Sequence, residues 1–186
     1  QTPANADGTP IGALVSNSGK ISANGGTVLL TARAAKNVID NVINSSGIIE
    51  AKTASMVNGE IVLDGGNTGE VVVTGSLDAS GKNAGETGGT VKVLGNQVVL
   101  ADGAVVDASG DAGGGTVLVG GNFHGAGPEQ NAATTIITAG ATINADAITT
   151  GNGGNVAVWS EQSTAFDGSV SANGGSVSGN GGMVET

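Results

Sequence analysis

Carboxylates recur at one position of a repeating pattern and are the first candidates for chemistry in this sequence. Glu50, Asp78 and Asp107 each precede an alanine, and the intervals between them are 28 and 29 residues. If the chain winds into stacked turns of that length, these side chains lie ~4.8 Å apart and repel one another unless a cation such as Ca²⁺ bridges them. We favour a solvated acidic ladder instead, because the calcium-binding signature Gly-Gly-x-Gly-x-Asp does not occur. We therefore expect no metal site and no cofactor.

The few aromatic and imidazole side chains form a second group of candidates. Phe123 and the sole histidine, His124, lie in residues 120–133, a segment that lengthens one repeat, and Trp159 is the sole tryptophan. Loops that project from a rigid scaffold often bind ligands, so Phe123, His124 and Trp159 are the predicted ligand-binding residues, with surface glycans as candidate ligands. We favour the alternative that this loop folds over the scaffold and covers apolar surface.

Catalysis is not expected. Polysaccharide-cleaving enzymes need paired carboxylates, usually helped by a basic residue and by aromatic platforms. Arg33 is the only arginine, Trp159 is the only tryptophan, and nothing in the sequence selects one carboxylate pair. We therefore predict no catalytic residues and a protein that is not an enzyme.

An internal repeat determines the elements that must position these residues. One motif (an aliphatic residue, any residue, then alanine) occurs six times, and its alanines are 28, 28, 29, 37 and 27 residues apart. A second motif, glycine followed by alternating aliphatic residues, stands between these copies, and a looser aliphatic run such as Val38-Ile39 follows it. The repeated residues are Ala23, Ala51, Ala79, Ala108, Ala145 and Ala172, and Gly26, Gly59, Gly89, Gly115, Gly154 and Gly182.

Three short β-type runs per repeat, separated by Gly, Asn, Asp and Ser, predict an all-β fold, a right-handed parallel β-helix. We expect about six coils of roughly 28 residues, three short strands per coil, and one extra loop at 120–133. The coils start near residues 19, 47, 75, 103, 140 and 168. Residues 19–186 form a single domain, and residues 1–18 form an N-terminal extension or linker. An antiparallel sandwich is the rival fold, but hairpins do not repeat one motif three strands later at a constant period.

The composition excludes several functions. The 186 residues carry a net charge of −10, which repels nucleic acid, so no nucleic-acid partner is expected. The absence of cysteine excludes disulfides, thiolate metal sites and a cysteine nucleophile. No apolar run approaches the ~20 residues that a membrane-spanning helix needs. Aromatic residues make up 2% of the chain, so Val, Ile, Leu and Ala must fill the core.

Apolar residues also occur where the pattern places side chains in water. Alternation along the second motif gives two inward aliphatic columns with one outward column between them. Leu29, Val62 and Leu118 belong to that outward column. Either a loop covers them or another rod does, so they are the predicted self-association surface.

Motifs in the second half of the chain carry a family resemblance. They are residues 107–133, Thr142-Ile-Asn-Ala-Asp-Ala147, Gly151-Asn-Gly-Gly-Asn-Val-Ala-Val-Trp-Ser160 and Gly179-Asn-Gly-Gly-Met-Val-Glu-Thr186. This stretch resembles the repeat region of the large filamentous-haemagglutinin-like exoproteins of Gram-negative bacteria, which are secreted by the two-partner route through a dedicated outer-membrane pore. The resemblance covers residues 75–186 well and residues 19–74 only as a generic repeat.

The resemblance implies a secreted protein, extracellular or on the outer cell surface, with a two-partner secretion transporter as its partner. The secretion domain of such exoproteins lies at their N-terminus and finds no convincing match here. We therefore expect an internal segment, and the end at Glu185-Thr186, halfway through a coil, favours that interpretation.

Three functions remain open. The first is a non-catalytic structural shaft segment of a secreted bacterial surface adhesin or biofilm-matrix exoprotein. The second is a self-assembling extracellular fibre subunit that stacks through open coil ends. The third is a carbohydrate-binding or carbohydrate-cleaving β-helix protein. We favour the first.

Overall fold

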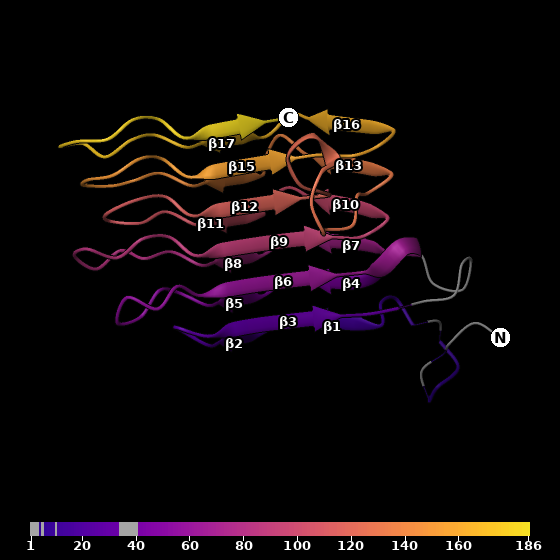
Figure 1. Cartoon of the computed structure of the whole chain (residues 1–186). Coiled ribbons are helices and arrows are strands. Elements are labelled where there is room, and N and C mark those ends of the chain that lie inside the picture. The colour runs from indigo at the N-terminus through magenta and orange to yellow at the C-terminus, as the bar shows by residue number, and fades with distance from the viewer. Residues whose placement is uncertain (1–3, 5, 10, 34–40) are drawn as a thin grey trace.

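The computed structural model describes residues 4, 6–9, 11–33 and 41–186, and these residues contain eighteen strands. The strands form three six-stranded parallel sheets. The coils stack into a rod, with the first coil at one end and the last coil at the other, and the three sheets run along its length (Figure 1). The predicted solenoid of about six coils with three strands per coil is therefore confirmed. Among the described residues, no helix is long and apolar enough to cross a membrane.

Each coil contributes one strand to each sheet. Sheet I contains β2 (Lys20–Ser22), β5 (Ile48–Glu50), β8 (Ser76–Asp78), β11 (Val105–Asp107), β14 (Thr142–Asn144) and β17 (Ser169–Ser171). Sheet II contains β3 (Thr27–Thr31), β6 (Glu60–Asp64), β9 (Thr90–Leu94), β12 (Thr116–Val119), β15 (Asn155–Val158) and β18 (Met183–Glu185). Sheet III contains β1 (Val15–Asn17), β4 (Asn41–Ser45), β7 (Glu70–Val73), β10 (Gln97–Leu100), β13 (Thr134–Ile137) and β16 (Ser163–Phe166). Two short 3₁₀ helices, η1 (Gly66–Thr68) and η2 (Phe123–Gly125), lie between strands.

The first coil differs in detail from the sequence pattern. The run Val38-Ile39, expected as the third strand of this coil, lies outside the described residues. The third strand that the structure describes is β4 (Asn41–Ser45), which pairs with β7 of the next coil. Strand β1 (Val15–Asn17) lies within the segment expected as an extension and pairs with β4, so sheet III begins before residue 18.

The core consists of aliphatic columns that run along the rod. One column joins Val28, Ile61, Val91, Val117, Val156 and Val184 in unbroken register, as the alternation predicts. Ile61, Val91, Val117 and Val156 are fully buried, whereas Val184, in the last coil, is 43% exposed although the pattern places it on the inward side. Parallel pairing satisfies the backbone between coils, which allows a chain so poor in large hydrophobic residues to fold.

Alanine and glycine of the two motifs meet where each coil turns from sheet I to sheet II. The backbone N–H of the motif glycine donates to the carbonyl of the motif alanine, for example from Gly89 to Ala79 at 2.7 Å and from Gly154 to Ala145 at 2.7 Å. A Cβ on Gly89 would lie 2.2 Å from the carbonyl oxygen of Gly59 in the previous coil. The repeat therefore keeps glycine because the backbones of successive coils leave no room for a side chain.

Candidate functional site

Residues 120–133 form a loop that lies along the outer face of sheet II, and we call this loop the clasp (Figure 1). Near its end, Glu129 Oε1 lies 3.1 Å from Lys92 Nζ of β9. Gln130 Nε2 donates to the carbonyl of Gly66, between β6 and β7, at 2.9 Å. Near its start, His124 Nδ1 lies 2.9 Å from Glu185 Oε1 of β18. The clasp thus links the second and third coils to the last one.

Glu129 is the charged anchor of the clasp. Burial acts to raise its pKa, but the hydrogen bonds from Asn122 Nδ2, at 2.8 Å, and from Lys92 outweigh burial and hold the pKa below the ordinary value of 4.5. Glu129 is therefore a carboxylate at neutral pH, held on one side by the loop itself and on the other by the sheet.

The clasp covers part of the outward apolar column. In register, Lys92 is followed by Leu118, Ala157 and Glu185, and the clasp contacts the first and last of these four residues. Leu118, at 3% exposure, and Ala157, at 0%, are accordingly buried between them. The expectation that Leu118 belongs to an exposed self-association surface is therefore wrong, because the clasp occupies that surface.

The other two residues of the predicted self-association surface lie beyond the clasp. Leu29 is 59% exposed and Val62 is half-buried. Self-association through them stays a prediction.

The clasp also determines how Trp159 is presented. Its indole is half-buried, and its Nε1 has no hydrogen-bond partner among the described residues. A Cβ on Gly121 would lie 3.0 Å from Trp159 Cδ1, and one on Gly125 would lie 2.6 Å from Nε1. The backbone of the clasp thus rests on the indole, and no side chain fits between them.

The structure brings the three predicted ligand-binding residues together at the clasp. Trp159 lies beneath it, Phe123 is half-buried, and the side chain of His124 is 84% exposed. Ligand binding by Phe123, His124 and Trp159 stays a prediction. The arrangement does show the clasp covering apolar surface, which was the alternative interpretation of this loop.

The acidic ladder is present, but lysines accompany it. Glu50, Asp78 and Asp107 are adjacent in the register of sheet I. Lys20 Nζ lies 3.0 Å from Glu50 Oε2, Lys52 Nζ lies 3.1 Å from Asp78 Oδ2, and Lys82 Nζ lies 2.7 Å from Asp107 Oδ2. The protein's own lysines therefore neutralise the ladder, and no bridging Ca²⁺ is needed to offset the repulsion between these carboxylates.

The ion pairs shift the pKa values of the ladder. The hydrogen bond from Lys20 holds the pKa of Glu50 below its ordinary value of 4.5. Burial acts to raise the pKa of Asp107, but hydrogen bonds from Lys82 and Ser109 outweigh it and keep the pKa below 3.8. The hydrogen bond to Asp78 raises the pKa of Lys52 above 10.5. Among the described residues, no three His, Cys, Asp or Glu side chains are grouped so that they could hold a metal ion.

The sequence analysis missed these lysines although a signal was present. Lys52 follows Glu50 by two residues, and Lys82 follows Asp78 by four, so both lysines stand just beyond the ladder position of their coil. Because the lysines occupy different positions relative to the ladder, only a search for basic residues close to each ladder carboxylate would have found them.

Comparisons with known proteins show what the chain is similar to. No family model matches the chain, and no curated protein matches it. A crystal structure of the HMW1 secretion domain from Haemophilus influenzae matches with a TM-score of 0.68 and 31% sequence identity, over 92% of this chain. The chain spans 43% of the length of that structure.

This match confirms the resemblance to filamentous-haemagglutinin-like exoproteins of the two-partner route. It also adds a point that the sequence motifs did not give. The sequence motifs alone do not indicate a secretion domain, whereas the structure that this chain resembles is a secretion domain.

Proposed function

We propose that the chain is a non-catalytic length of shaft in a secreted bacterial surface adhesin or biofilm-matrix exoprotein. The observation that carries this proposal is the parallel pairing of three six-stranded sheets along one axis, interrupted among the described residues by one register shift between β4 and β7. A stack of this kind transmits load through backbone hydrogen bonds in every coil. Six coils at ~4.8 Å per coil give a rigid spacer about 29 Å long.

The similarity to a secretion domain supports a route of export. We propose that the protein containing this chain leaves the cell through an outer-membrane two-partner transporter and remains extracellular or on the outer surface. The 31% identity to the HMW1 secretion domain supports this route. A chain without cysteine also suits passage in an unfolded form, because it cannot form disulfides before export.

Negative-stain electron microscopy over a concentration series, with size-exclusion chromatography, tests the shaft proposal. Short rods of uniform size at every concentration support it. Long unbranched fibres would overturn it in favour of the self-assembling subunit, with Leu29 and Val62 as the first surface to mutate. Cleavage of any polysaccharide in a panel of bacterial and host glycans would contradict a non-catalytic role. Glycan binding that Trp159→Ala abolishes would instead favour the carbohydrate-binding alternative.

A further inference from the structure

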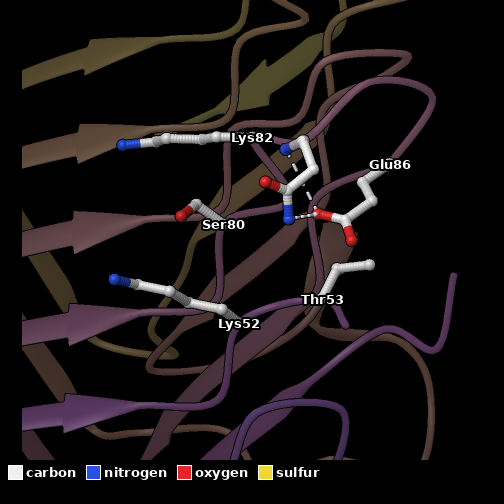
Figure 2. A pocket seen from close by; sticks show the side chains of 6 residues that line it. Lys52, Thr53, Ser80, Lys82 and Glu86 are labelled. Atoms are coloured by element: carbon white, nitrogen blue, oxygen red, sulfur yellow. Dashed lines mark hydrogen bonds between the residues drawn. The ribbon is translucent and has the colours of Figure 1, made fainter. Parts of the chain in front are cut away.

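A pocket outside the clasp lies where the second and third coils turn from sheet I to sheet II. It has a volume of about 160 Å³ and is lined by Lys52, Thr53, Ser80, Lys82, Asn83 and Glu86 (Figure 2). Thr53, Ser80 and Glu86 are all buried, with exposures of 4%, 2% and 5%. These three residues form a buried polar floor, and the more exposed side chains of Lys52, Lys82 and Asn83 form the rim.

Glu86 is the unusual member of this pocket. Its Oε2 accepts hydrogen bonds from the backbone N–H of Asn83 at 3.2 Å and from Asn83 Nδ2 at 2.9 Å. No hydrogen bond from the described residues reaches its other oxygen, Oε1, and none of their cations forms an ion pair with Glu86. Oε1 is not among the fully buried side-chain atoms that lack a partner, so it is open to solvent from the pocket and available to a ligand.

The lysines in the pocket wall do not compensate Glu86. Lys52 Nζ is bound to Asp78, and Lys82 Nζ is bound to Asp107 on sheet I. Figure 2 shows both lysine side chains extended to the side of the pocket opposite Glu86 and Thr53. Their charges are thus neutralised outside the pocket, and their aliphatic stems line it.

The hydroxyl groups of the pocket have no proton left for a ligand. Thr53 Oγ1 donates to the carbonyl of Thr87 at 2.7 Å, and Ser80 Oγ donates to Asp78 Oδ1 at 2.6 Å. Their oxygens remain acceptors, as do Asn83 Oδ1 and Glu86 Oε1. The pocket therefore combines several acceptors, the apolar lysine stems and one carboxylate that has no ion-pair partner among the described residues.

We propose that this pocket binds a primary ammonium group. An ammonium carries three N–H donors and one positive charge, which match the free acceptors and the charge of Glu86. The volume of about 160 Å³ admits the ammonium together with a few methylene groups, which pack against the lysine stems. The net charge of −10 attracts cations to the rod from a distance. The binding site is additional to the proposed shaft function and does not depend on it.

The first test is an NMR titration of the ¹⁵N-labelled full chain with n-butylammonium chloride and, in parallel, with tetramethylammonium chloride at equal ionic strength. We expect saturable shifts of the Thr53, Asn83 and Glu86 amides with n-butylammonium alone, because tetramethylammonium has no N–H donor. Equal shifts with both salts would show only a cation atmosphere and overturn the proposal. The absence of shifts with n-butylammonium would overturn it too.

The second test uses matched substitutions. Glu86→Gln keeps an acceptor for Asn83 and removes the charge, and we expect it to weaken n-butylammonium binding about tenfold. Glu161→Gln removes an exposed carboxylate from the last part of the rod and should leave the affinity unchanged. Equal loss in both variants would contradict a specific site. The unliganded spectra of both variants establish that they fold.

The source of the ammonium is resolved by two further titrations on the same sample. Spermidine represents free polyamines, and a short lysine-containing peptide with a blocked N-terminus represents a lysine side chain of a partner protein. Tighter binding of the peptide identifies a protein partner, whereas tighter binding of spermidine identifies a free amine.

Discussion

Gly115 donates its backbone N–H to the carbonyl oxygen of Ala108 at 2.7 Å and thereby closes the fourth coil where it passes from β11 to β12. The same pair of motif residues closes the first coil between Gly26 and Ala23 at 2.9 Å, and the last between Gly182 and Ala172 at 2.7 Å. The two sequence motifs are therefore the two halves of one contact.

Gly115→Ala tests this contact. The backbone of Gly115 has no positive φ, but a Cβ there would lie 2.0 Å from the carbonyl oxygen of Gly89 in the preceding coil. We expect the free energy of unfolding to fall by about 3 kcal/mol, because rigid backbone must move. Guanidinium unfolding followed by circular dichroism measures the change.

Gly19→Ala is the matched control for this substitution. A Cβ at Gly19 would meet nothing within 4 Å, so stability should stay within about 0.5 kcal/mol of the wild type. Similar losses in both variants would show that the glycine requirement is not caused by packing between coils.

Acid should weaken the lysine–carboxylate ladder. The pKa values of Glu50 and Asp107 are lowered by folding, so both groups stabilise the fold fully above their ordinary values of 4.5 and 3.8. That stability is lost as the pH falls through the lowered values, because protonation breaks the pairs with Lys20 and Lys82. Unfolding free energies measured between pH 7 and pH 3 should show the decline.

Asp107→Asn separates this effect from general acid denaturation. The variant should be less stable than the wild type at pH 7, and the difference should shrink as the pH falls below 3.8. A difference that stays constant across this range would rule out the charge of Asp107 as the cause.

Gly125→Ala should detach the clasp from Trp159. Gly125 has a φ of 63°, and a Cβ there would lie 2.6 Å from Trp159 Nε1. We expect the tryptophan emission to shift to longer wavelength and iodide quenching to increase, because the indole becomes more exposed to water. Gly103→Ala is the control, since Gly103 also has a positive φ, of 92°, but its nearest contact would be 3.4 Å away. An emission spectrum that moved in both variants would point to general strain.

His124→Ala should loosen the last strand. His124 binds Glu185 twice, through Nδ1 at 2.9 Å and through its backbone N–H to Oε2 at 3.0 Å, and the substitution removes the first contact. Because the imidazole is exposed, the global stability should change little. Amide hydrogen exchange should nevertheless accelerate in β18 and not in β12. Unchanged exchange in β18 would show that the side-chain contact does not hold this strand.

The periodic part of the fold could be predicted from the sequence, because inward columns such as Val91 and Val117 depend only on alternation and coil length. The position of the clasp could not. Leu118 belongs to the same outward column as Leu29, yet one is 3% exposed and the other 59%. That difference depends on where a non-repeating loop reaches, and its contacts with Lys92, Gly66 and Glu185 do not follow from the repeat.

Of the candidate sites, one could be predicted from the repeat and the other could not. The ladder of Glu50, Asp78 and Asp107 follows from the period alone. The pocket at Glu86 is formed by turns whose sequences differ from coil to coil, so the repeat pattern does not predict it.

The contacts of the clasp affect how the rod unfolds. In a solenoid each repeat contacts only its neighbours, so stability is nearly a sum of local terms and the terminal repeats fray independently. Here Gln130 bonds to Gly66 across 64 residues of sequence, and His124 bonds to Glu185 across 61. These links join coils that do not touch through their strands. The last coil is thereby coupled to the middle of the rod, and the array behaves more like one cooperative unit than like a chain of independent repeats.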